Sequence, residues 1–249
     1  MIDTEHLVKI AKLNNLRPWQ QEKHYIQTIV LVALSEYPLV FKGGTYLWFF
    51  HNLDRFSEDL DFTAAGELPR NLGEIVSESL KMFGVENSIK EINNTENSLS
   101  FRISAKGPLN TSEKDLCHVY VEISKREKVL QQSLSFKLAF DAYGLPVKII
   151  QGMSITEVAA EKMRAVVTRE KARDLYDLFF IIKYQNTSFD IKLINEKLHY
   201  YSMEFSHSLF EKKIKEKKKI WASELKGLIF GKLPEYEEVA TTLMDFAKK

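Results

Sequence analysis

Residues 42–62 read KGGTYLWFFHNLDRFSEDLDF, and this stretch dominates the fold that the sequence predicts. Residues 39–42, LVFK, are typical of a short buried strand that enters a turn formed by a glycine pair. The aromatic run at residues 45–52 can form a helix, and residues 60–62 can form a second strand. We therefore expect a strand–helix–strand unit.

Two aspartates with one residue between them lie at the end of this stretch. On a strand, Asp59 and Asp61 point to the same face, roughly 6.5 Å apart along the chain, while Leu60 and Phe62 point to the opposite face and into a core. Two such carboxylates can bind divalent cations together and so hold a triphosphate for in-line attack. A D-x-D pair by itself is also typical of a solvated surface pair or a turn.

The glycine pair gives these aspartates a context. Gly43, Gly44 and Thr45 lie at the predicted strand-to-helix junction, where backbone N–H groups and the helix dipole favour an anion such as phosphate. An ordinary turn is the alternative, but it leaves Asp59 and Asp61 unexplained. The sequence thus predicts phosphate donors and metal-binding carboxylates at the two ends of one nucleotide site.

A third carboxylate is expected on a neighbouring strand. In residues 118–124, HVYVEIS, Glu122 alternates with Val121 and Ile123 and so projects from the opposite face to them. It can therefore stand beside the two aspartates. An acidic residue on a solvated strand face is the alternative.

A second motif lies at residues 161–181, EKMRAVVTREKARDLYDLFFI. Lys162, Arg169 and Arg173 are spaced by seven and four residues, so on an unbroken helix they share one stripe. A helix break near Glu170 still leaves them clustered. Such cations can neutralise the charge that builds on phosphates during transfer, whereas the alternative is a charged helix with salt-bridged neighbours.

Composition limits the class of protein. The 249 residues are 45% hydrophobic, with ten glycines and six prolines, which is typical of an ordered globular protein. Because 35 basic residues nearly cancel 34 acidic ones, the overall charge predicts no partner. Cys117 is the only cysteine, which excludes an intramolecular disulfide and a four-cysteine zinc site. The N-terminal residues lack a signal-peptide pattern and the apolar runs are too short to span a membrane, so we expect a cytoplasmic protein.

The order of elements predicts two parts. Helical spacing over residues 19–35 and 71–83 is followed by alternating, strand-like segments from about residue 88 to 150. Beyond Met153 the pattern returns to helices. We therefore predict an α+β fold, with a mixed α/β part at residues 1–152 and a helical part at residues 153–249.

The two motifs together resemble the AbiEii/AbiGii toxin family of nucleotidyltransferases. The resemblance rests on GGTYLWFFHNLDRFSEDLDF at residues 43–62 and EKMRAVVTREKARDLYDLFF at residues 161–180, and it covers roughly residues 15–185. It implies a polymerase-β-like nucleotidyltransferase core, made of a mixed sheet with helices, followed by a helical C-terminal domain that completes the active site.

The resemblance also implies roles for individual residues. Asp59 and Asp61 match the metal ligands, and Glu122 is a candidate third ligand, although family members can work with two. Catalytic roles fall to the two aspartates, to the nucleotide-contacting Lys162 and to Asp174 in the R-D-x-Y-D segment. The expected NTP-binding residues are Gly43, Gly44, Thr45, Arg55, Ser57, Arg169 and Arg173.

The activity implied by the resemblance is Mg²⁺-dependent transfer of a nucleotide from an NTP to an acceptor, with two Mg²⁺ ions at the site. The acceptor in some members is the 3′ end of tRNA, and the protein is then the toxin of a toxin–antitoxin or abortive-infection system in phage defence, with a cognate antitoxin as a possible partner. Two alternatives stay open: a small-molecule nucleotidyltransferase of the antibiotic-modifying type, and a non-catalytic module that binds RNA or an antitoxin.

A lysine-rich run, EKKIKEKKK, occupies residues 211–219 and carries six lysines against two glutamates. A solvated helix face is the commoner meaning of such a run. The competing interpretation is a phosphate-contacting surface for an RNA acceptor. Nearby aromatic residues such as Phe210 and Trp221 can stack on bases, although packing in a helical core is the more usual role.

Overall fold

The computed structural model describes residues 1–185 and 187–248. They divide into two compact units, each of which is described by itself. The first unit contains residues 1–46, 57–129 and 133–152, and the second contains residues 47–56, 130–132 and the chain from Met153 onward. The predicted α+β class is confirmed, since one unit is built on a sheet and the other on helices.

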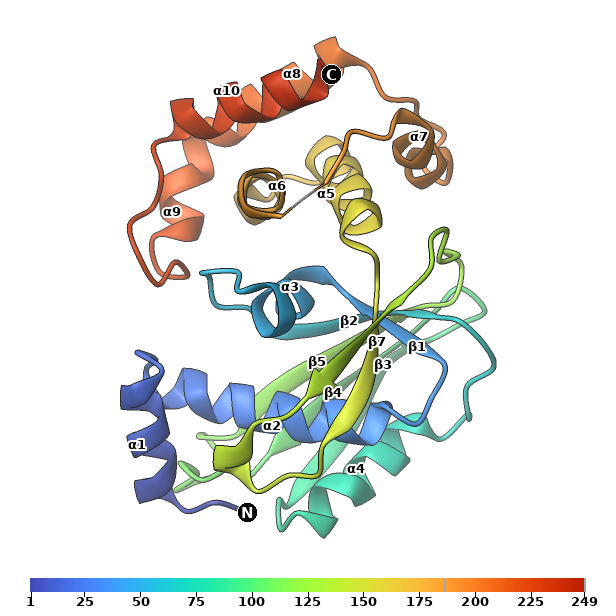
Figure 1. Cartoon of the computed structure of the whole chain (residues 1–249). Helices are drawn as coiled ribbons and strands as arrows, with labels where there is room; N and C mark the ends of the chain where they lie inside the picture. The colour runs from blue at the N-terminus through green and yellow to red at the C-terminus, as the bar shows by residue number, and fades with distance from the viewer. Residues whose placement is uncertain (186, 249) are drawn as a thin grey trace. The chain divides into compact units, whose positions relative to one another are not determined.

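The first unit is built around a mixed sheet. Among the described residues, seven strands form one sheet in the order β3-β4-β5-β2-β1-β7-β6 (Figure 1). The central strand β2 runs antiparallel to β1 and parallel to β5. The strands are β1 (Leu39–Lys42), β2 (Asp59–Ala64), β3 (Asn87–Asn94), β4 (Ser98–Ala105), β5 (Cys117–Ser124), β6 (Leu134–Leu138) and β7 (Lys148–Gly152).

Helices cover one face of this sheet. The long helix α2 (Pro18–Leu34) begins with a proline at its first position, where the missing N–H is not needed, and α4 (Leu72–Met82) packs against α2 and β3. α1 (Thr4–Leu13) packs on α2, and the short η1 (Asp141–Tyr143) precedes β7. Phe62 of β2 lies among α2 side chains, so the buried side of β2 faces these helices.

The register of β2 therefore decides which residues face away from the helices. Leu60 and Phe62 are buried, whereas Asp59 and Asp61 are only half-buried, as the alternation predicts. In the parallel pairing with β5, Asp61 lies opposite Glu122. The three carboxylates thus share the sheet face opposite to α2 and α4.

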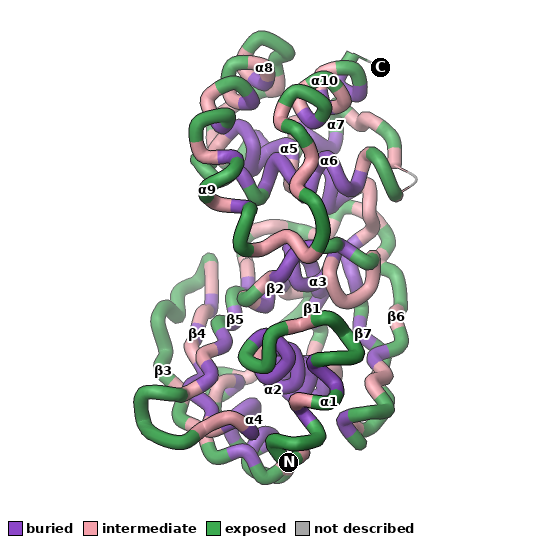
Figure 2. The backbone as a smooth tube through the Cα atoms, turned by 90° about the vertical axis from the view of Figure 1, so that its left-hand side faces the viewer, coloured by how far each residue is buried: buried purple, intermediate pink, exposed green. Residues whose placement is uncertain are grey.

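The second unit is a helical cluster built on two neighbouring helices, α5 and α6, whose residues are mainly buried (Figure 2). The other helices pack on this pair, and Ser154, Asp190 and Ser206 cap the N-termini of three of the helices with their side chains. The helices are α5 (Ile155–Thr168), α6 (Ala172–Tyr184), α7 (Ile191–His199), α8 (His207–Glu216), η2 (Lys217–Ile220), α9 (Trp221–Leu225) and α10 (Tyr236–Ala247). No helix among residues 1–185 and 187–248 is long and apolar enough to cross a membrane.

A buried carboxylate holds the short segment 130–132 in the second unit. Glu157, in the first turn of α5, accepts hydrogen bonds from the backbone N–H groups of Leu130 and Gln131 at 2.9–3.1 Å. It also lies 2.5 Å from Nζ of Lys197 on α7. A fully buried carboxylate is stable only with such compensation, and these contacts supply it.

Helix boundaries differ from the sequence prediction at two places. α3 (Gly43–His51) begins at Gly43, so the glycine pair forms the first turn of the helix and does not precede it. The second motif does not form an unbroken helix, because α5 ends at Thr168 and α6 begins at Ala172. The break falls where the alternative interpretation placed it, near Glu170.

Candidate active site

The glycine turn of the first unit is packed directly against the D-x-D motif. Gly43 has a φ of +78°, a left-handed conformation that glycine adopts without a steric penalty. Lys42, which precedes it, pairs with Asp61 across β1 and β2. A Cβ atom placed on Gly43 would overlap Oδ2 of Asp61 and lie 2.8 Å from its Cγ. Glycine is therefore required here both by the backbone and by the neighbouring carboxylate.

Thr45 connects the first turn of α3 to β2. Its side chain is fully buried, and its hydroxyl donates a hydrogen bond of 2.5 Å to the backbone carbonyl of Asp59. Thr45 was expected to hold phosphates, but its hydroxyl proton is directed at the main chain of β2. In this structure its visible effect is to position Asp59. Gly44, which lies between Gly43 and Thr45 in the chain, is also buried.

The carboxylates of β2 and β5 form an acidic group on the sheet face that the first unit's helices leave uncovered. Asp59 and Asp61 are half-buried and Glu122 is exposed. In the described part of the chain, no three His, Cys, Asp or Glu side chains form a group that could hold a metal ion. Glu122 is the register neighbour of Asp61 on β5, but it does not complete a three-residue cluster with the two aspartates. Carboxylate oxygens are the donors that Mg²⁺ prefers, and Mg²⁺ usually takes one or two protein carboxylates and completes its shell with water and phosphate. The pair Asp59 and Asp61 fits that requirement.

A lysine that the sequence motifs did not single out belongs to the same region. Lys42 is 8% exposed, and its Nζ lies 2.8 Å from Oε2 of Glu127. Its position directly before the glycine pair was the available signal. Because Lys42 is the register partner of Asp61, it brings a positive charge to the strand that flanks the acidic pair.

In the second unit, the structure brings Lys162 and Asp174 together. Nζ of Lys162 on α5 lies 2.9 Å from Oδ1 of Asp174 and 2.7 Å from Oδ2 of Asp177, both on α6. The three side chains are between 0% and 12% exposed. The predicted pair is thus part of a group of three, and Asp177 was not among the predicted site residues. Its i, i+3 spacing from Asp174, which puts both on one face of α6, was the only signal for it.

Arg55 enters this group through Asp177. Its Nε and Nη2 donate hydrogen bonds of 2.6 and 2.7 Å to the two carboxylate oxygens of Asp177, which is the bidentate geometry that guanidinium favours. Nη1 of Arg55 donates to the backbone carbonyl of Phe56 at 2.9 Å. The arginine of the R-F-S-E-D-x-D run therefore supports Lys162 indirectly. Ser57 belongs to the first unit and is half-buried, and its carbonyl accepts from Nε2 of Gln27 at 3.3 Å.

The charges of this group stabilise one another against burial. Burial by itself would raise the pKa of Asp177, but the adjacent Arg55 and Lys162 outweigh it and lower that pKa to about 2. Burial by itself would likewise lower the pKa of Lys162, and the two aspartates outweigh it and raise that pKa. The pKa of Asp174 is lowered by Lys162 against the effect of burial. All four side chains consequently remain charged at neutral pH.

The remaining predicted cations lie at the break between α5 and α6. Arg169 and Arg173 are exposed, and neither forms a salt bridge with a residue that the structure describes. Arg169 is near enough to Asp174 to contribute to lowering its pKa. The break thus separates the cations into a buried Lys162 and two exposed arginines.

The lysine-rich run has two kinds of members. Lys213, Lys215 and Lys218 form salt bridges with nearby glutamates, as expected for a solvated helix face. Lys217 differs, because it is 2% exposed and its Nζ donates at 2.6 Å to the carbonyl of Val166 in the last turn of α5. Burial lowers the pKa of Lys217. The neighbouring aromatic residues Phe210 and Trp221 are buried and belong to the helical core.

Comparisons with known proteins agree with these motifs. Residues 29–243 match the family described as "Nucleotidyl transferase AbiEii toxin, Type IV TA system", which confirms the resemblance drawn from the sequence. The solved structures that share the fold include JHP933 from Helicobacter pylori, with 21% identity, 92% of this chain and 90% of that chain covered, and a TM-score of 0.58. They also include MenT4, a nucleotidyltransferase toxin from Mycobacterium tuberculosis, with 19% identity, 97% and 88% covered, and a TM-score of 0.57. No curated protein matches the chain.

Proposed function

From the premise that this chain belongs to the AbiEii family of nucleotidyl transferase toxins, we propose that it transfers a nucleotide from an NTP to an RNA acceptor in a Mg²⁺-dependent reaction. The single observation that carries the proposal is the packing of Gly43 against Asp61 and of Thr45 against Asp59. These two contacts fix the glycine turn at the start of α3 directly beside the two carboxylates. That is the arrangement needed to bind a metal-complexed triphosphate.

In the proposed reaction the first unit binds the triphosphate. Asp59 and Asp61 would hold Mg²⁺, which would neutralise phosphate charge. The acceptor hydroxyl attacks the α-phosphorus in line, the bond from that phosphorus to the oxygen bridging to the β-phosphate breaks, and pyrophosphate leaves. The backbone N–H groups at the start of α3, at Gly43 to Thr45, lack acceptors within the helix and could donate to a phosphate. The missing side chain of Gly43 leaves Asp61 in place while a phosphate approaches the backbone.

We assign to Lys162 the nucleotide-contacting role that the family resemblance implies. Lys162 is held between Asp174 and Asp177, so its ammonium group is oriented before the substrate binds. We assign Lys162 to the charge that develops on the phosphates, and Asp174 to orienting Lys162 or accepting the proton of the attacking hydroxyl. Arg55 and Asp177 are positioning residues, because they act through Lys162.

An RNA acceptor is favoured by the exposed cations of the second unit. Arg169, Lys171 and Arg173 cluster at the break between α5 and α6 without salt bridges to other described residues. Such residues bind the phosphate backbone of a polynucleotide and release counterions. A small-molecule acceptor would not need this cluster. The family description also implies an antitoxin that counteracts such a toxin, and we place this activity in the cytoplasm.

The test incubates the full-length protein with each α-³²P-labelled NTP, Mg²⁺ and total RNA. Asp59→Ala and Asp61→Ala should abolish labelling of RNA, whereas Glu96→Ala, an exposed acid outside the sheet face, should leave it intact. Omission of Mg²⁺ should also abolish labelling. Transfer that survives either aspartate substitution in a folded protein contradicts the assignment, and NTP consumption that needs a small-molecule acceptor in place of RNA supports the antibiotic-modifying alternative.

A further inference from the structure

A groove in the first unit lies away from the proposed chemistry. It has a volume of about 720 Å³ and is bounded by α4, by the C-terminal end of α2 and by the start of β7. Because α2 and α4 cover the sheet face opposite to Asp59 and Asp61, the groove is separated from the acidic group by the sheet itself. The proposed reaction does not use it.

One wall of the groove is a complete stripe of α4. The lining residues of this wall recur at helical spacing along all three turns, which gives a wall about 16 Å long. That length matches a partner helix of about 11 residues. The stripe consists of Asn71, Glu74, Ile75, Glu78, Ser79 and Met82.

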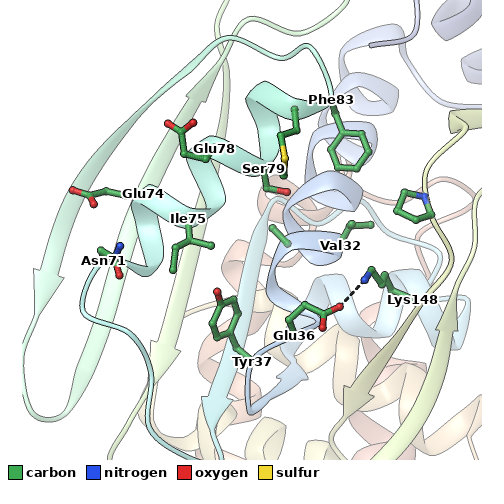
Figure 3. Close-up of a pocket in the computed structure, with 13 residues that line it drawn as sticks. Val32, Glu36, Tyr37, Asn71, Glu74, Ile75, Glu78, Ser79, Phe83 and Lys148 are labelled. Carbon is green, nitrogen blue, oxygen red and sulfur yellow. Dashed lines mark hydrogen bonds and ion pairs between the residues drawn. The ribbon is translucent and has the colours of Figure 1, made fainter.

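The floor of the groove is apolar, and part of it is accessible. Ile75 of α4, Val32 of α2 and Tyr37 line the groove together, and Phe83 lies at the end of α4 (Figure 3). Ile75, Tyr37 and Phe83 are half-exposed, and Met82 is 80% exposed. Accessible apolar side chains that line a shallow groove favour an amphipathic helix laid along it.

The rim of the groove carries negative charge. Glu74 and Glu78 lie one turn apart on α4. Glu78 forms an exposed salt bridge of 2.7 Å with Lys81, whereas Glu74 forms no salt bridge with any residue in the described ranges. On the opposite rim, Oε1 of Glu36 accepts a hydrogen bond of 2.5 Å from Nζ of Lys148, so these two charges neutralise each other (Figure 3). The lining thus holds three glutamates against one lysine, an acidic excess in a chain whose overall net charge is +1.

We propose that this groove binds a cationic amphipathic helix of a partner protein. Leucine-like side chains at i, i+3, i+4 and i+7 would fill the floor against Ile75 and Tyr37, and lysine or arginine residues beside that stripe would meet Glu74 and Glu78. The proposal is independent of the nucleotide-transfer reaction, since none of these residues belongs to the proposed site.

The test measures binding of a fluorescein-labelled model peptide to the full-length protein by fluorescence anisotropy. The peptide has about 12 residues, leucines at i, i+3, i+4 and i+7, lysines on both sides of this stripe, and one hydrocarbon staple on its remaining face. A second peptide replaces the lysines with glutamates. We expect saturable binding of the lysine peptide that weakens as salt rises, and no binding of the glutamate peptide.

Two variants locate the binding site. Ile75→Glu should weaken the lysine peptide at least about tenfold, because it places a charge on the apolar floor. Glu74→Lys combined with Glu78→Lys should weaken it about fivefold or more. The matched control, Glu67→Lys combined with Glu96→Lys, makes the same change in net charge at exposed positions outside the groove and should bind like the wild type. RNA labelling by all variants should stay at the wild-type rate.

Several results would overturn the proposal. They are absence of binding by the lysine peptide, equal binding by both peptides, and loss of binding in the control that matches the loss in the rim variant. A concentration-dependent dimer in sedimentation velocity that Ile75→Glu dissolves would assign the groove to a second copy of this chain. Displacement of the peptide by a neutral amphiphile, with no effect of the rim charges, would assign it to a small apolar ligand.

Discussion

Replacing Gly43 by alanine tests whether the glycine turn exists to hold Asp61. The alanine side chain introduces two separate effects. It puts an L-residue at a φ of +78°, and it places a methyl group onto the carboxylate of Asp61. Gly144 offers a matched control, because its φ is +62° and a Cβ there meets no atom within 4 Å. Gly144→Ala therefore carries the backbone strain without the clash.

The two effects have different magnitudes and different consequences. Left-handed strain costs about 1–2 kcal/mol in either variant, which lowers Tm by a few degrees in a protein of this size. In Gly43→Ala, Cγ of Asp61 must also move from 2.8 Å to ordinary contact at about 3.4 Å or beyond, and Oδ2 must move further. A misplacement approaching 1 Å in a catalytic group can reduce the rate about 100-fold.

The assay compares initial rates of nucleotide transfer to RNA across a Mg²⁺ titration, together with Tm. We expect Gly43→Ala to lose roughly 10- to 100-fold in rate and to need more Mg²⁺, whereas Gly144→Ala keeps the wild-type rate. Gly43→Ala should lose at least as much Tm as Gly144→Ala, because the overlap with Asp61 adds to the shared backbone strain. A Gly43→Ala protein with the rate of Gly144→Ala would refute the argument that this glycine positions Asp61.

Two further predictions concern stability. Asp177→Asn leaves the buried Arg55 without its charged partner and Lys162 with one aspartate, so the free energy of unfolding in urea should fall by about 3–5 kcal/mol; a loss below 1 kcal/mol would show that this ion pair does not hold the helices. Burial lowers the pKa of His24 to about 3, so between pH 6.5 and 3 the unfolded chain binds a proton that the native protein does not. The contribution of His24 to the free energy of unfolding is complete above pH 6.5 and falls by about 1.4 kcal/mol per pH unit below it. His24→Gln should therefore flatten the pH dependence of the unfolding free energy between pH 6.5 and 5. An unchanged slope would contradict the assignment.

The elements near the D-x-D motif could be predicted because their signals are local. Alternation along Asp59 to Phe62 depends only on the two-residue period of a strand, so it shows which side chains share a face before any partner strand is known. The helical spacing of α2 and α4 has the same local origin. The family resemblance then connected two motifs that are far apart in the chain, which periodicity cannot do.

Contacts between distant residues could not be predicted in this way. Asp177 and Arg55 are 122 positions apart, and their bidentate pairing depends on how the helices pack. Lys217 looks like its neighbours in a lysine-rich run, yet it is buried because the carbonyl of Val166, 51 residues earlier, compensates the loss of water. Local sequence carries no record of such compensation, since the cost and the partner arise only when the chain is folded.

The sequence by itself determined the class of fold, the face of β2 that carries Asp59 and Asp61, and the pairing of a glycine turn with a D-x-D motif. Tertiary structure alone decided that Gly43 has to be glycine because Asp61 fills the space of its side chain, and that Lys162 lies between two aspartates. It also decided that one stripe of α4 borders an acidic groove. The physical reason is the same in each case. Periodicity orients a side chain relative to its own element, whereas the atoms that it meets are supplied by elements that only the folded chain brings together.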